Sequence, residues 1–91
     1  MKQYNIVYGR QGTGKSFHAK DIARYFHASA VDDSGAALED ILNFIKARYS
    51  ARRWVFIVQE KPKIPFLLRH HVSAYDITDL EDAMIPILVF N

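Results

Sequence analysis

Residues 9–16 read Gly9-Arg10-Gln11-Gly12-Thr13-Gly14-Lys15-Ser16, and the interpretation of the whole chain depends on them. Their spacing is Gly, four residues, then Gly-Lys-Ser. Glycines let the backbone fold into a loop whose N–H groups converge, which creates a binding site for an anion. The Lys15 side chain adds a positive charge, and the Ser16 hydroxyl can ligate Mg²⁺. The spacing therefore predicts a loop that binds the phosphates of a nucleotide.

The segments on both sides of the loop have the pattern that such a loop requires. Residues 3–8 are rich in β-forming side chains and predict a first strand. Apolar residues then recur at the spacing of one helical face, at Ala19, Ile22, Ala23 and Phe26. They predict a helix over residues 15–27, whose positive end points at the bound phosphates. We therefore expect residues 9–17, with Phe17 as the last, to contact the nucleotide; an ordinary glycine-rich turn is the alternative.

The composition of the 91 residues fits one globular domain, with 49% hydrophobic and 13% aromatic residues. The chain has no cysteine, which excludes disulfides and cysteine-based zinc sites. No apolar run approaches the roughly 18–20 residues that span a bilayer, and the N-terminus has no signal-like segment. We therefore expect a cytoplasmic protein without a membrane partner. The net charge of +2 does not by itself indicate nucleic-acid binding.

The rest of the chain alternates between strand-like and helix-like segments. Strands are expected at 28–32, 54–58, 72–77 and 85–90, a helix at 35–49, and short helical turns at 66–71 and 79–83. The unbroken apolar run at 54–58 is typical of a central strand that is covered on both faces. This alternation predicts an α/β layered fold with a mainly parallel sheet, formed by a single domain over residues 1–91.

The loop spacing is that of the Walker A motif, and with its flanking segments the chain resembles the P-loop NTPase superfamily. The order of elements resembles the core of AAA+ ATPases. That resemblance implies a three-layer fold with a five-stranded sheet of order 5-1-4-3-2. It covers nearly the whole chain by element order, but by motif only residues 9–16, with partial support from residues 55–60.

The resemblance also implies roles for residues outside the loop. In this family an acidic Walker B pair follows the third strand, and a polar sensor residue follows the fourth. Here the pair is Gln59-Glu60, so a neutral amide replaces the carboxylate that holds Mg²⁺. The implied catalytic residues are Lys15, Glu60 as the general base and Thr78 as the sensor, and the implied Mg²⁺ site contains Ser16 and Gln59. The alternative is that the pair only ends a strand at the surface.

The sequence gives weaker indications about two further parts of such an ATPase, the charge-neutralising arginine and the lid. Arg10 and Arg69 are candidates for the arginine that neutralises charge during phosphoryl transfer. The larger family members carry a helical lid, whereas this sequence ends at Asn91, directly after the last expected strand. We therefore expect a homo-oligomer or another protein to supply the missing wall. The adjacent His70 and His71 would point to opposite sides of a strand, so we reject a metal site there.

These residues leave several functions open. The first is an ATP- or GTP-binding protein with Mg²⁺ that acts as a weak or partner-activated NTPase, and the second is a nucleotide- or phosphate-binding module without hydrolysis. A third is association with nucleic acid through Lys46, Arg48, Arg52, Arg53 and Trp54, or through Lys61, Lys63 and Arg69. The alternative for the first cluster is a solvated helix end beside a buried tryptophan. A small-molecule kinase using Asp32-Asp33 would need a longer chain.

Overall fold

The computed structural model describes residues 2–9, 19–47 and 52–80. Their elements are, in order, β1 (Tyr4–Tyr8), α1 (Ala19–Tyr25), β2 (Ala30–Asp32), α2 (Leu38–Ala47), β3 (Trp54–Val58), the 3₁₀ helix η1 (Phe66–Leu68) and β4 (Val72–Asp76). A helical turn follows at 77–80. All the strand pairs are parallel, so the predicted α/β class with a parallel sheet is confirmed. The predicted fifth strand, 85–90, lies outside the described residues.

The order of the four described strands is β2-β3-β1-β4. The predicted order 5-1-4-3-2 is wrong, because it places the fourth strand between the first and the third. Instead, β1 pairs directly with β3, with Tyr8 opposite Val58. The physical reason lies in burial: residues 55–58 are buried, whereas Ala74 and Tyr75 of β4 are exposed, so β4 is the less suited to a central position.

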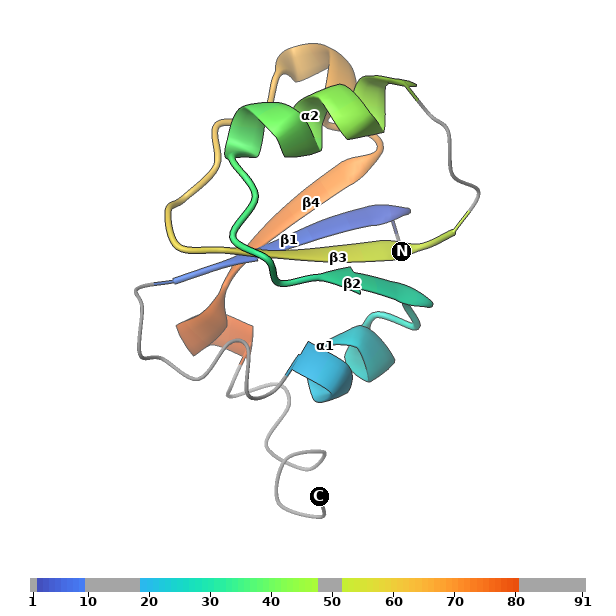
Figure 1. The fold of residues 1–91 in the computed structure, drawn as a ribbon, viewed down its shortest axis with the longest axis vertical. Coiled ribbons are helices and arrows are strands. Elements are labelled where there is room, and N and C mark those ends of the chain that lie inside the picture. The colour runs from blue at the N-terminus through green and yellow to red at the C-terminus, as the bar shows by residue number, and fades with distance from the viewer. Residues whose placement is uncertain (1, 10–18, 48–51, 81–91) are drawn as a thin grey trace.

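Helices cover both faces of the sheet because successive connections run in opposite directions. The connection from β1 to β2 crosses the sheet one way, and the connections from β2 to β3 and from β3 to β4 cross it the other way. Right-handed crossovers then place α1 on one face and α2 with η1 on the other. Figure 1 shows this arrangement, with α2 and η1 above the sheet and α1 and the turn at 77–80 below it.

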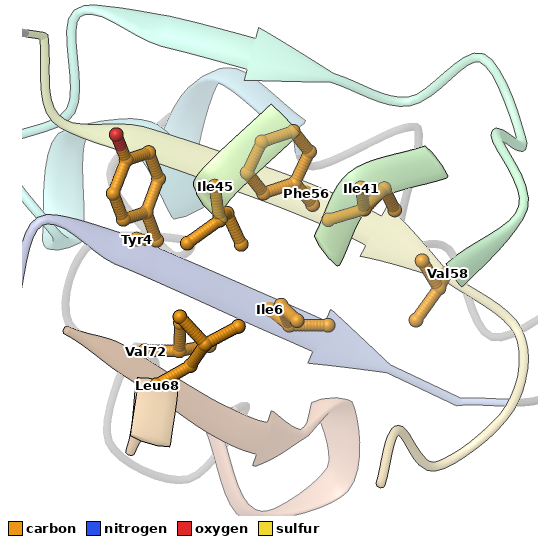
Figure 2. Packing of buried hydrophobic residues seen from close by; sticks show 8 residues of the cluster. All are labelled: Tyr4, Ile6, Ile41, Ile45, Phe56, Val58, Leu68 and Val72. Atoms are coloured by element: carbon orange, nitrogen blue, oxygen red, sulfur yellow. The ribbon is translucent and has the colours of Figure 1, made fainter. Parts of the chain in front are cut away.

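Two apolar clusters hold the helices to the sheet. The first lies beneath α2 and η1 and consists of Tyr4, Ile6, Ile41, Ile45, Phe56, Val58, Leu68 and Val72 (Figure 2). The second lies on the α1 face and consists of Val7, Ile22, Phe26, Val55, Ile57, Ile77 and Leu80. Neighbouring residues of β3 alternate between the two clusters, as expected for a strand that is buried on both faces.

One polar side chain is buried within β1. Asn5 is fully buried, and its Nδ2 donates hydrogen bonds to the carbonyl oxygens of Lys2 (3.1 Å) and Trp54 (3.3 Å). Its Oδ1 has no hydrogen-bond partner within the described residues. The amide therefore connects β1 to the start of β3 while leaving one buried acceptor unsatisfied, an arrangement that costs about 1–3 kcal/mol relative to a satisfied one.

The first helix ends two residues earlier than predicted, in a Schellman motif. The N–H of Ala28 donates to the carbonyl of Ala23 (2.8 Å), and the N–H of His27 donates to that of Arg24 (3.1 Å). His27 takes the left-handed conformation that this motif requires, with φ +53°. Because the N–H of Ala28 is used in the helix end, β2 begins at Ala30 rather than at Ala28.

The second helix begins later than predicted, at Leu38 instead of Gly35. The side chain of Asp32 accepts hydrogen bonds from the N–H (3.0 Å) and the Oγ (2.6 Å) of Ser34, which turns the chain at the end of β2. Gly35 then has φ +79°, which no helical residue adopts. Likewise β4 ends at Asp76, one residue before the predicted end, because Ile77 starts the helical turn at 77–80.

Candidate functional site at the carboxyl edge of the sheet

The candidate site is built around the carboxyl end of β1. Tyr8, the last residue of β1, lies opposite Val58 of β3 on one side and opposite Asp76 of β4 on the other. Gly9, the first residue of the loop motif, and Gln59 therefore follow directly neighbouring strands. The other predicted nucleotide contacts, Arg10, Gln11, Gly12, Thr13, Gly14, Lys15, Ser16 and Phe17, lie outside the described residues.

The connections that leave β1 and β3 run to opposite faces of the sheet. The chain after β1 reaches α1 on one face, and the chain after β3 reaches η1 on the other (Figure 1). In open parallel sheets, such a divergence leaves a crevice outside the carboxyl ends of the two strands, where ligands bind. The point where the connections diverge therefore lies between β1 and β3, and Gly9 and Gln59 flank it.

Gln59 and Glu60 lie beside the loop-bearing strand. Both side chains are exposed, and the two residues follow the last residue of β3. In the predicted sheet order the fourth strand would separate them from β1, whereas the observed order makes β3 the direct neighbour of β1. The polar pair is therefore closer to the start of the loop motif than the resemblance implied.

On the other side of β1 is a carboxylate that the sequence analysis did not single out. Asp76 ends β4 opposite Tyr8, and its Oδ1 accepts a hydrogen bond from the N–H of Thr78 (2.8 Å). Asp76 thus caps the helical turn at 77–80 and holds the exposed Thr78 near the carboxyl edge. Its signal in the sequence was an acidic residue at a strand end, and the family pattern directed attention to Thr78 instead.

All eight acidic side chains of the described residues gather at this edge. They follow strand ends or lie in first turns of helices that start at this edge: Asp21, Asp32, Asp33, Glu39, Asp40, Glu60, Asp76 and Asp79. Arg24 pairs with Asp21 (4.0 Å), and Lys61 and Lys63 follow Glu60. These cations offset part of the charge, and the remainder disfavours a polyphosphate without cations. A nucleotide bound here therefore needs cations to accompany it.

The donor set suits a magnesium ion that is held mainly by its ligand. Among residues 2–9, 19–47 and 52–80, no group of three or more His, Asp or Glu side chains could hold a metal ion. Mg²⁺ usually keeps several waters and is bound by one or two protein oxygens together with substrate phosphates. Gln59, the one predicted Mg²⁺ ligand within the described residues, is exposed after β3, and Ser16 lies outside the described residues.

Arg69 lies at the opposite edge of the sheet, away from the candidate site, and its exposed side chain fits a solvated charge rather than a nucleotide contact. Its carbonyl accepts a hydrogen bond from Nζ of Lys2 (2.6 Å), and the carbonyl of His71 accepts one from the N–H of Tyr4 at the start of β1 (3.1 Å). A strand of five residues separates these positions from the carboxyl edge by about 13 Å. The other candidate, Arg10, lies outside the described residues.

Trp54 is part of a packed aromatic group. Its ring stacks on Phe56 with a centroid distance of 5.4 Å and an interplanar angle of 6°, and it meets the edge of Phe44 at 5.1 Å. Trp54 therefore lies in a strand as predicted, but it is only partly buried, so the interpretation of a fully buried tryptophan is not confirmed.

Comparisons with protein-family models, with curated proteins and with solved structures find no significant match to this chain. No helix within the described residues is long and apolar enough to cross a membrane.

Proposed function

We propose that this protein binds a nucleoside triphosphate, ATP or GTP, at the carboxyl edge of its sheet between β1 and β3. One observation carries the proposal: the strand that leads into Gly9 and the loop motif is the neighbour of β3 at the point where their connections diverge. The converging loop N–H groups and Lys15 supply the phosphate contacts. The base and ribose would lie on the outer side of the edge, where an oligomer or another protein completes the site.

The proposed site requires Mg²⁺ because of the acidic edge. The cation, when bound, offsets the charge of the β- and γ-phosphates, with the Ser16 hydroxyl and Gln59 on the protein side. Gln59 is neutral, so the protein contributes little attraction of its own to the ion. Nucleotide affinity should therefore rise steeply with Mg²⁺ concentration, and free Mg²⁺ should bind weakly.

Hydrolysis, where it occurs, would use Glu60 to orient and deprotonate the attacking water and Lys15 to stabilise charge on the transferred phosphoryl group. Thr78 would act as the hydroxyl sensor at the end of β4. The exposed position of Glu60 favours slow turnover, since an exposed carboxylate does not exclude bulk water from the reaction. The alternative is a module that binds nucleotide without hydrolysing it.

A titration with ATP and GTP in the presence of Mg²⁺ tests the binding proposal by calorimetry. Lys15→Ala should weaken binding about tenfold to a hundredfold, the range for losing a charged hydrogen-bond donor. Lys20→Ala is the matched control, because it removes the same charge from an exposed position of α1. Equal affinities for both variants, or no heat with the unmodified protein, would refute the proposal.

Phosphate release separates the two forms of the proposal. If the protein is an NTPase, Glu60→Gln should lower the rate about a hundredfold, as expected when a general base is lost. Gln59→Asp, which restores an acidic pair, should raise the rate at limiting Mg²⁺. Release by the unmodified protein that is no faster than by Lys15→Ala leaves the non-hydrolysing module as the function.

A further inference from the structure

The amino ends of the strands lie at one level and form an edge of the sheet, which we call the amino edge. All four strands begin at one level, with Ala30 opposite Trp54, Trp54 opposite Tyr4, and Tyr4 opposite Val72. Backbone bonds continue the alignment outward, including the N–H of Trp54 to the carbonyl of Gln3 (2.8 Å). The residues just before the strands therefore lie side by side along one edge.

These preceding residues carry positive charge. Arg52 and Arg53 come before β3, Lys2 before β1, and Arg69 before β4. The side chain of Gln3 donates to the carbonyl of Arg52 (2.9 Å), and Lys2 donates to that of Arg69 (2.6 Å), which ties the three segments together. Three neighbouring strands spread the cations over about 9.6 Å. We call these four residues the basic edge.

Acidic residues are absent from the segments that surround the basic edge. The described residues directly before β1, β3 and β4, at 2–3, 52–53 and 69–71, contain no Asp or Glu. All the described acidic residues lie toward the other end of the strands, at the candidate nucleotide site. The described part of the molecule is therefore electrically polarised along its strands, with an anion-attracting surface at the end opposite the proposed site.

An exposed aromatic ring lies next to the basic edge. Phe66 of η1 has 69% of its surface exposed, and the guanidinium of Arg69 lies over its ring at 4.3 Å from the centroid. The N–H of His71 donates a hydrogen bond to the carbonyl of Leu68 (2.9 Å), so η1 lies close to the start of β4. Phe66 thus combines a largely exposed ring with an adjacent cation, whereas Trp54 is partly buried against Phe44 and Phe56.

We propose that the basic edge binds single-stranded nucleic acid, with Arg52, Arg53 and Lys2 on successive phosphates and a base stacked near Phe66. Proteins that bind single strands without sequence preference combine a cationic track with aromatic rings in this way. An anionic membrane surface is the competing partner, since Leu67 is also exposed. The single strand is favoured because Lys2, Arg52 and Arg53 lie in a row before the starts of β1 and β3, and only Arg69 lies against Phe66.

Fluorescence anisotropy with a labelled oligothymidylate of about 20 nucleotides measures this binding across a range of salt concentrations. Arg52→Ala with Arg53→Ala should weaken binding at least about tenfold and reduce the log–log salt slope by about 1.4, which is 0.7 for each lost phosphate contact. Lys20→Ala with Lys61→Ala is the matched control, because it removes two exposed lysines away from the basic edge, and it also tests the other cluster considered above, which contains Lys61. Arg52→Lys with Arg53→Lys should retain most of the binding because it keeps both charges, and the thermal unfolding of the alanine variant shows whether that variant is folded.

The Phe66 variants separate a base from a membrane. Phe66→Leu keeps an apolar side chain but loses the aromatic face, so oligonucleotide binding should fall about fivefold to a hundredfold. Binding to phosphatidylserine vesicles would be nearly unaffected by that change. Absence of oligonucleotide binding, equal losses in both double variants, or binding to vesicles in its place would overturn the inference. Lys15→Ala should leave oligonucleotide binding intact, so the proposal does not depend on the nucleotide site.

Discussion

A pair of introduced cysteines can test the adjacency of β1 and β3, on which the candidate site depends. The chain has no cysteine of its own, so any disulfide in a double variant comes from the introduced pair. Tyr8→Cys with Val58→Cys replaces two residues that lie opposite each other at the carboxyl edge. We expect this variant to oxidise readily and completely without unfolding.

The Cα separations predict that this pair forms a disulfide and that a matched control pair does not. Neighbouring strands lie about 4.8 Å apart, within the Cα separations of about 4.4–6.8 Å that a disulfide bridges. Val58→Cys with Asp76→Cys uses residues at the same level but with β1 between them. Their separation of about 9.6 Å exceeds the limit. In the order 5-1-4-3-2 the control pair would be adjacent and the test pair would not.

The disulfide should also stabilise the fold measurably. Residues 8 and 58 enclose a loop of about 50 residues, for which chain entropy gives about 4 kcal/mol, and strain usually reduces the measured gain to about 2–4 kcal/mol. In a domain of this size that corresponds to a rise of at least about 8 °C in Tm. Comparing the oxidised and reduced forms of the same variant cancels the packing lost with Tyr8 and Val58.

The outcome is read from non-reducing electrophoresis, mass spectrometry and thermal unfolding. Oxidation of the control pair, with no oxidation of the test pair, would refute the sheet order described above. It would also remove the basis for placing Gln59 and Glu60 beside the loop motif. Failure of both pairs to oxidise would show that the carboxyl ends are not aligned as described.

Three further changes test local features of the fold, each by chemical or thermal denaturation. His27→Gly should stabilise the protein by about 0.5–1 kcal/mol, because glycine adopts the left-handed helix end without strain; a loss of stability would contradict this reading. Asn5→Asp should destabilise it by about 3 kcal/mol or more, since a carboxylate would face two carbonyl oxygens, whereas Asn5→Ala should cost less. Asp76→Ala should lose about 1 kcal/mol of cap energy that Asp76→Ser retains, and equal losses would exclude the cap at Thr78.

Local patterns in the sequence were enough to identify most of the elements. The apolar run at 54–58 predicted β3 with its bounds, because a strand buried on both faces needs an unbroken apolar segment. The helical spacing after residue 37 predicted α2 apart from its ends. The start of α2 depends on a hydrogen-bonded turn at Asp32 and Ser34, which competes locally with helix formation.

The sequence by itself determined the α/β class and the parallel strands, since these follow from local periodicity, and its spacing at residues 9–16 is the basis for the proposed phosphate site. Only the tertiary structure decided which strands are neighbours, because that choice depends on burial across the whole sheet: β3, buried on both faces, pairs with β1, and the half-exposed β4 takes its other side. The same packing brings Asp76 to the candidate site and sends Arg69 to the opposite edge. The positions of Asp76 and Arg69 relative to the site cannot be predicted from residue spacing along the chain.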